Sequence, residues 1–291
     1  MKNIDFRDQI RRNKLKSSFL ILVVGIILIV LGYVITFAFS TDYFFLIIVI
    51  AIIFSMSYTM FSYYNSHKIA IKSVRAKEAK RSEFPDYHRL VEGLCVASGL
   101  PKPKLYIMPD SQINAFASGR DPKHAVICVT QGALEKLGRR ELEGVLAHEL
   151  GHIGNYDIRF ITLVSVMVGM VAIISQIFLR SLWFRNGDND KAGMIFMIIG
   201  IVLAILAPIA VYFVQASISR KREYSADATS VKFTRNPEGL IGALEKIKTD
   251  HVKTEKRVSK ALAPLFFSNP FRNAGSTHPP LDKRIETLKR M

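Results

Sequence analysis

Two histidines and a glutamate give the strongest chemical signal in the chain. His148 and His152 lie in the stretch AHELGHIGNYD, and Glu149 follows the first of them directly. Residues four apart lie on one face of an α-helix, so both imidazoles can reach one metal ion. Glu149 then lies where a base could act on a metal-bound water. Residues 139–156 carry an apolar stripe, which predicts that this helix is largely buried.

A metal site needs a third ligand, and three continuations of the motif can be compared. A histidine six residues further on, with a glycine before it, is excluded because Ile158 and Asn155 occupy those positions. A motif inside a membrane helix, with a distant aspartate, is disfavoured by charges such as Arg139 just before it. The stretch SRKREYSADA offers Glu223 as a ligand. Asp227, four residues later, could accept a hydrogen bond from a ligating histidine and fix its tautomer.

This ligand set favours catalytic zinc. Two histidines and one glutamate leave the fourth tetrahedral position open for water, whereas structural zinc sites are closed. Zinc lowers the pKa of its water towards about 7, and Glu149 would take the proton and deliver it to the leaving amine. The preference for zinc over another divalent metal rests on ligand type alone. We therefore expect one Zn²⁺ per chain.

A small sheet is expected beside this helix. Strands are predicted at 104–108 and 124–130, and residues 114–117 are predicted to form a sheet edge. An edge strand can pair with an extended peptide through backbone hydrogen bonds, with little sequence preference. Asn114 could equally be an ordinary turn residue.

Four apolar segments are long enough to cross a bilayer, which takes about 20 helical residues. They cover 18–40, 43–64, 161–179 and 193–215. The first is too long for a cleaved signal peptide, and no small-residue cleavage site follows it. We expect the two ligand-bearing helices to be extensions of the last two spans, with the metal roughly 12–15 Å from the membrane.

Lysines and arginines flank these segments unevenly. They are dense before the first, after the second and after the fourth, and the turn between the first two has none. The positive-inside rule then puts the soluble regions in the cytoplasm. The predicted organisation is a cytosolic N-terminal segment, a transmembrane hairpin, a first catalytic segment, another transmembrane hairpin and a second catalytic segment, at residues 1–17, 18–64, 65–160, 161–215 and 216–291.

Neither the overall charge nor the cysteines indicate nucleic-acid binding or a cysteine-based site. The net charge is +16, with 40 Lys and Arg against 24 Asp and Glu, but the basic residues flank apolar segments. No aromatic-interleaved groove or nucleic-acid motif accompanies them, so we expect no nucleic-acid partner. Cys95 and Cys128 form no CxxC pair and are interpreted as buried, reduced thiols.

Taken together, four motifs resemble the HtpX family of membrane zinc metalloproteases, relatives of the CaaX prenyl proteases. The motifs are INAFASG, AHELGHIGNYD, SRKREYSADA and THPPLDKRIETL, in the family's order and spacing around four hydrophobic segments. The resemblance covers essentially the whole chain. It implies a mainly α membrane protein with four transmembrane helices and a cytosolic α+β, gluzincin-type peptidase domain with a small β-sheet.

The resemblance also implies roles for individual residues. It makes the two histidines and Glu223 the zinc ligands and Glu149 the catalytic base. It further implies that Asn114 and Ala115 contact the substrate backbone, that His278 steadies the substrate carbonyl or oxyanion, and that Arg284 supports the site from behind the ligands.

The function implied is ATP-independent endopeptidase activity in membrane-protein quality control. The protein would be a multi-pass protein of a bacterial-type inner membrane, with its catalytic domain facing the cytoplasm. Its partners would be the lipid bilayer and polypeptides, chiefly damaged or unassembled membrane proteins. Two alternatives stay open: a more specialised processing protease, and a membrane chaperone or scaffold with a vestigial site.

Overall fold

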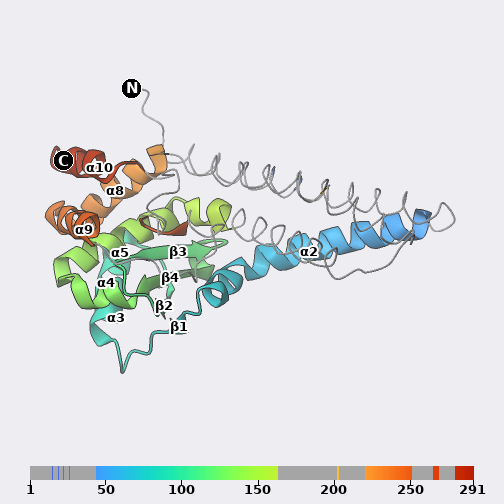
Figure 1. Cartoon of the computed structure of the whole chain (residues 1–291), viewed down its shortest axis with the longest axis horizontal. Helices are drawn as coiled ribbons and strands as arrows, with labels where there is room; N and C mark the ends of the chain where they lie inside the picture. The colour runs from blue at the N-terminus through green and yellow to red at the C-terminus, as the bar shows by residue number, and fades with distance from the viewer. Residues whose placement is uncertain are drawn as a thin grey trace, which may run out of the picture.

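The computed structural model describes residues 44–162, 220–250, 265–268 and 279–291, together with positions 15, 19, 22, 26 and 202. In Figure 1, helices surround a small sheet, and the long helix α2 (Phe44–Ser73) projects away from them.

The sheet has four strands in the order β1-β2-β4-β3. β2 and β4 run parallel, whereas β3 is antiparallel to β4 and β1 is antiparallel to β2. The strands are β1 (Lys77–Glu78), β2 (Lys104–Met108), β3 (Ala115–Gly119) and β4 (Ala125–Thr130). The three predicted strands are therefore confirmed to within two residues at their ends, and β3 lies at the sheet edge as expected.

Both faces of β3 and β4 are covered, which explains why their sequences do not alternate between apolar and polar residues. Every residue of β3 and β4 is buried. One face packs into the main core with α5, and the other packs against the end of α2 and the segment 265–266. Cys95 and Cys128 are free and buried, as predicted, and burial raises the pKa of the Cys128 thiol.

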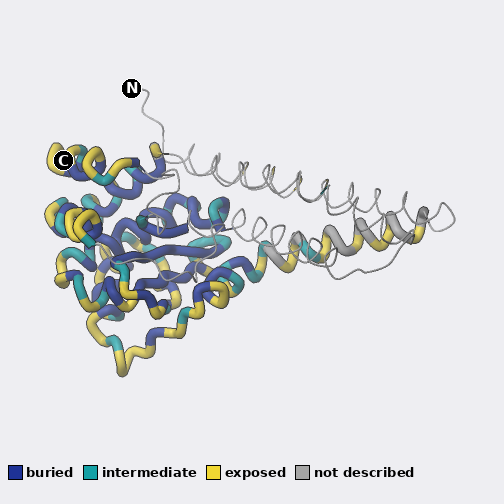
Figure 2. The backbone as a smooth tube through the Cα atoms, in the orientation of Figure 1, coloured by how far each residue is buried: buried dark blue, intermediate teal, exposed yellow. Residues whose placement is uncertain are grey.

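Helix α5 (Arg139–Gly154), which confirms the predicted helix around the two histidines, lies at the centre of the described structure. It packs on β3 and on three helices, and nearly all of its residues from Leu142 to Ile153 are buried. In Figure 2 the dark blue, buried tube is concentrated around the sheet and α5, whereas the outer helices also carry exposed stretches. Other described helices are α3 (Pro85–Ser98), α4 (Gln131–Lys136), α8 (Arg220–Thr234), α9 (Glu238–Thr249) and α10 (Leu281–Leu288), with a short 3₁₀ turn η2 (Pro122–His124).

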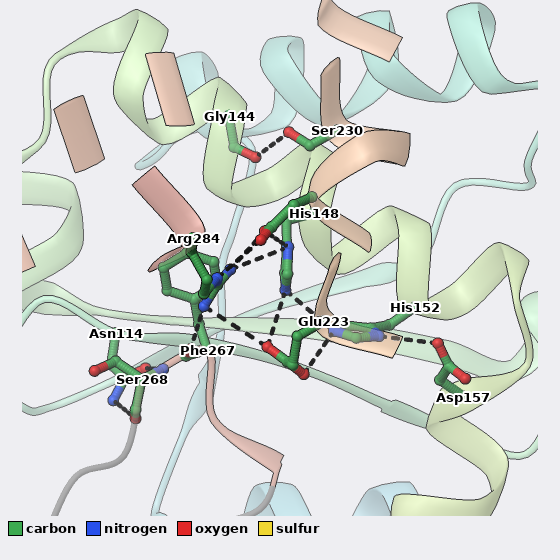
Figure 3. A network of polar contacts seen from close by, with 11 residues as sticks. Asn114, Gly144, His148, His152, Asp157, Glu223, Ser230, Phe267, Ser268 and Arg284 are labelled. Atoms are coloured by element: carbon green, nitrogen blue, oxygen red, sulfur yellow. Dashed lines mark hydrogen bonds and ion pairs between the residues drawn. The ribbon is translucent and has the colours of Figure 1, made fainter. Parts of the chain in front are cut away.

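A glycine lets α9 approach α5 closely. A Cβ on Gly144 would lie 2.6 Å from the backbone nitrogen of Leu240, at the start of α9. The carbonyl of Gly144 also accepts a hydrogen bond from the hydroxyl of Ser230 on α8 (2.8 Å; Figure 3). Gly144 therefore fixes the spacing between the helix that carries the histidines and the helices packed against it.

We expect Gly144→Ala to lower the free energy of unfolding by about 1–3 kcal/mol, because the methyl group meets backbone that cannot rotate away. Thermal unfolding of the detergent-solubilised chain measures the effect. Gly93→Ala is the matched control, since nothing lies within 4 Å of its added Cβ. That helical change should be neutral or slightly stabilising. Equal melting temperatures for the two variants would contradict the close-packing argument.

The metal-binding helix does not continue straight into the third apolar segment. α5 ends at Gly154, and Tyr156 adopts a φ of 59° before helical backbone resumes over 157–162. A positive φ interrupts the helical hydrogen-bond ladder. A turn therefore separates α5 from the helical residues 157–162. The expectation that the two ligand-bearing helices extend the last two membrane spans stays a prediction, because those spans lie mostly outside the described residues.

The predicted spans fall mostly outside the described residues. Those at 18–40, 161–179 and 193–215 have only isolated positions or short ends within them, whereas 43–64 coincides with the first two thirds of α2. Over the stretches of chain that the structure describes, no helix meets the length and apolarity required to cross a membrane.

Candidate metal centre and active site

Three predicted ligands from two helices meet at one buried point (Figure 3). The Nε2 atoms of His148 and His152, one turn apart on α5, are 3.1 Å apart. Glu223 on α8 places a carboxylate oxygen 3.6 Å from the Nε2 of His152 and another 3.9 Å from that of His148. One donor atom from each of the three residues lies within 4.8 Å of the others.

This donor set fits a tetrahedral zinc ion. Two nitrogens about 2.0–2.1 Å from zinc, at the tetrahedral angle, lie about 3.3 Å apart, close to the observed separation. The three residues are at most 8% exposed, so bulk water cannot compete for their donor atoms. His148, His152 and Glu223 would hold the ion, next to a small pocket that Glu149 also lines.

A buried ion pair holds His148 from behind. Its Nδ1 lies 2.9 Å from Oδ1 of Asp227, one turn beyond Glu223 on α8. Arg284 on α10 donates two hydrogen bonds to the same carboxylate, with N–O distances of 2.6 and 2.9 Å. Burial alone would raise the pKa of Asp227, but Arg284 and His148 outweigh it and lower this pKa. The ionised Asp227 fixes the tautomer that leaves Nε2 free to bind metal.

His152 also has an aspartate beside its Nδ1 atom, and the sequence did not predict this contact. Its Nδ1 lies 3.1 Å from Oδ2 of Asp157, which is fully buried. Asp157 follows the break at Tyr156, and the turn there brings it back beside the histidine. An acidic residue so close to His152 in the stretch GHIGNYD was a signal for this contact. The contact was not predicted, because residues five apart on an uninterrupted helix do not lie on the same face.

Asp157→Asn is expected to weaken zinc binding about 10–100-fold, because the amide orients His152 less firmly and withdraws a negative charge. Titration against a competing chelator measures the affinity. Asp86→Asn is the control, since that side chain is 79% exposed at the start of α3. An unchanged zinc affinity for Asp157→Asn would mean that the contact does not support the metal.

The histidines differ in their electrostatics. Burial lowers the pKa of His148 to about 4, so this imidazole is neutral and ready to act as a ligand. Burial also disfavours the charged form of His152, but the carboxylates of Asp157 and Glu223 outweigh it and raise the pKa to about 9. The carboxylates around His152 therefore favour a cation where the three donors meet. A divalent metal ion held there would be stabilised by the same carboxylates.

Glu149 points into the small pocket beside the ligands. The side chain is only 2% exposed, and the pocket is also lined by His152, Glu223 and Ala117 of β3. Burial raises the pKa of Glu149 to about 7, against a hydrogen bond from the Ala117 backbone that lowers it. A carboxylate with such a pKa can take up and release a proton near neutral pH.

Asn114 and Ala115, the two residues expected to contact the substrate backbone, form hydrogen bonds with another segment of the chain. The Ala115 carbonyl accepts a hydrogen bond from the Phe267 backbone (2.7 Å). The Asn114 side chain exchanges hydrogen bonds with the Ser268 backbone, at 2.8 and 3.1 Å. Phe116 also forms a β-bridge with Phe266. This stretch of the edge strand is thus already paired in this structure.

Phe267 connects that segment to the metal centre. Its ring packs edge-on against His148, with centroids 4.8 Å apart, and the Arg284 guanidinium lies over its face at 4.7 Å. Phe266 and Phe267 also line the pocket of Glu149. His278, the other residue predicted to act on the substrate, lies outside the described residues.

Residues 81–291 match the family model described as peptidase family M48. The chain belongs to this family. It is 42% identical over 286 residues to "Protease HtpX homolog" of Caldanaerobacter subterraneus subsp. tengcongensis, with 95% of each chain covered. It is 41% identical over 295 residues to the protein of the same name from Dictyoglomus thermophilum, covering 100% of this chain and 96% of that one. The predicted HtpX-type family is confirmed, and the M48 chain is a metalloendopeptidase.

A solved structure has a related fold. The crystal structure of S. mikatae Ste24p superposes with a TM-score of 0.51 at 18% identity. The match covers 95% of this chain and 65% of that one, so this M48 chain spans less than two thirds of its structural relative. At this identity the likeness concerns the fold alone.

Proposed function

We propose that the chain is an integral membrane zinc endopeptidase, with its active site on the cytoplasmic side of a bacterial-type inner membrane. Its substrates are damaged or unassembled membrane proteins. The observation that carries the peptidase assignment is the convergence of His148, His152 and Glu223 beside the buried Glu149. The same arrangement argues against a vestigial site, because both the ligands and the base are intact.

The residues divide the reaction between them. His148, His152 and Glu223 would hold zinc, which when bound lowers the pKa of water to about 7 and polarises a carbonyl. Glu149 takes a proton from the attacking water as the new C–O bond forms at the scissile carbon. The protonated Glu149 then delivers this proton to the amide nitrogen as the C–N bond breaks. The carboxylate is thereby restored, and the products are an acid and an amine.

Substrate backbone would align along β3, as expected for Asn114 and Ala115. Edge-strand pairing selects extended, unfolded chain more than sequence, which suits a protease that removes damaged proteins. Because Phe267 and Ser268 hold these two residues, a substrate that pairs at this point must first displace the segment. His278 is proposed to steady the substrate carbonyl or the oxyanion.

The membrane assignment is supported by the four apolar segments and by α2. This helix carries exposed apolar side chains along the stretch predicted to lie in the bilayer; among them are Leu46, Val49, Ile50, Ile53, Met56 and Phe61. Water is a poor solvent for such a surface, whereas lipid tails are a good one.

A cleavage assay with metal control tests the peptidase assignment. Purified chain in neutral detergent should cleave an unfolded polypeptide, lose activity with a zinc chelator and regain it when zinc is restored. Activity that survives complete removal of the metal would overturn the zinc mechanism. A substrate trap with Glu149→Gln in cells then tests the substrates: capture of folded soluble proteins, without membrane proteins, would contradict the quality-control role.

A further inference from the structure

A strongly basic hollow lies where α2 meets the sheet, away from the metal centre. Its volume is about 480 Å³. Its wall is formed by the C-terminal half of α2, the start of β2 and the turn between β3 and β4. Five cationic side chains contribute to it, namely Lys68, Lys102, Lys104, Arg120 and Lys123. We call this site the basic hollow.

Most of this charge is not neutralised within the protein. Lys102 pairs with Glu92 at 2.8 Å, and Arg120 lies 3.4 Å from Asp121. Among the described residues, no carboxylate lies within ion-pair distance of Lys68, Lys104 or Lys123, and all three are exposed. Three lysines that face one concavity repel one another, so an anion placed among them would be stabilised.

A histidine inside the basic hollow supports this interpretation. His67 is partly buried, and over the described residues its Nδ1 atom is buried without a hydrogen-bond partner. Burial lowers the pKa of His67, and the positive charges of Lys68 and Arg120 lower it further. The neutral imidazole is therefore surrounded by positive potential and has a polar atom for which the described residues supply no partner.

The basic hollow is continuous with an aromatic and apolar surface of α2. The Arg120 guanidinium lies over the ring of Tyr64 at 4.7 Å, and Arg159 lies over the ring of Tyr63 at 5.2 Å. One turn back along α2, Met60 and Phe61 are 54% and 58% exposed. Tyrosines between an apolar surface and a cationic one are typical of the membrane–water interface.

We propose that the basic hollow binds the phosphodiester headgroup of an anionic glycerophospholipid, with its acyl chains along the exposed apolar face of α2. A soluble anion would use the lysines but not the adjoining Met60 and Phe61, whereas a lipid uses both surfaces. The proposal rests on the membrane placement of α2 proposed above. Basic pockets at the cytoplasmic face of membrane helices can recognise such headgroups.

Lipid retention by the full chain tests the site. The protein in neutral detergent is incubated with phosphatidylglycerol or phosphatidylcholine of identical acyl chains, and bound lipid is counted by native mass spectrometry. Each basic residue near an anionic surface contributes on the order of fivefold in affinity. We expect the wild type to prefer phosphatidylglycerol by at least about tenfold. Equal retention of the two lipids would overturn the proposal.

Two triple variants localise the effect. Lys68→Gln, Lys104→Gln and Lys123→Gln together should abolish the preference. The control changes three exposed lysines elsewhere, Lys232→Gln, Lys283→Gln and Lys289→Gln, which removes the same net charge and should keep it. Retained preference in the first variant, or its loss in the control, would overturn the assignment to the basic hollow. Wild-type melting temperatures in lipid-free detergent check that both variants fold.

A melting-temperature measurement distinguishes a lipid site from a site for free phosphate. Glycerol phosphate, which has no acyl chains, should leave the melting temperature unchanged at concentrations where phosphatidylglycerol raises it. Equal stabilisation by both would replace the lipid site with a soluble-anion site. Zinc-dependent cleavage is measured on the same samples. Lost cleavage with intact lipid preference would refute the proposed peptidase function alone, and the reverse result would refute the headgroup site alone.

Discussion

Replacing Glu149 with glutamine is expected to reduce cleavage roughly a hundred- to ten-thousand-fold, the range that general acid–base catalysis contributes. Glutamine has nearly the same size and fills the same buried position, but it cannot take a proton from water or return one to the leaving amine. The metal ligands are unchanged, so zinc content should stay at one per chain. The measurements are cleavage rate and zinc stoichiometry on the same preparation.

The matched control for this change is Glu143→Gln. Glu143 lies on the same helix and is partly exposed outside the pocket, so the substitution makes the same chemical change without touching the site. Its activity and zinc content should equal those of the wild type. Equal cleavage by wild type and Glu149→Gln would remove Glu149 as the base.

Glu223→Ala is expected to bring bound zinc well below one per chain and to abolish cleavage with it. The decrease in zinc affinity should be larger than the about 10–100-fold decrease caused by removing a residue that only orients a ligand. The reason is that Glu223→Ala removes a ligand itself. Glu223 also lies 3.6 Å from Arg284, so its removal leaves positive charge less well balanced in the site. Metal analysis after dialysis, together with chelator competition, measures the effect.

Two further variants distinguish loss of a zinc ligand from loss of folding. Glu223→Gln keeps the side-chain size and should also lose zinc, since a neutral amide is a poor zinc ligand. Glu238→Ala, at the exposed start of α9, should retain both zinc and activity. Full zinc occupancy in a folded Glu223→Ala protein would show that Glu223 is not a ligand.

Local patterns in the sequence predicted much of the described structure. The apolar stripe around His148 predicted a buried helix, and α5 forms there because a buried surface with helical periodicity can be satisfied only by a helix. The strand at 104–108 was predicted with the ends that the structure shows, and that at 124–130 to within one residue.

Other features depend on contacts between distant segments. Arg284 lies 57 positions from Asp227, and only the packing of α10 against α8 lets the guanidinium reach that carboxylate. The pairing of Phe267 with Ala115 was not predicted, because nothing in a short apolar run specifies which sheet edge it meets. The basic hollow likewise needs α2 and the sheet together before its lysines share one concavity.

Residue types and their spacing were enough to predict a metal site. The i, i+4 histidines fixed two donors on one face, and residue type alone restricted the third to a few carboxylates such as Glu223. Tertiary structure decided how those donors are held and approached. The turn at Tyr156, with its positive φ, sends Asp157 back to His152, and the segment around Phe267 covers a stretch of the edge strand. Helical periodicity is a local property of the chain, whereas these contacts exist only after its segments have packed.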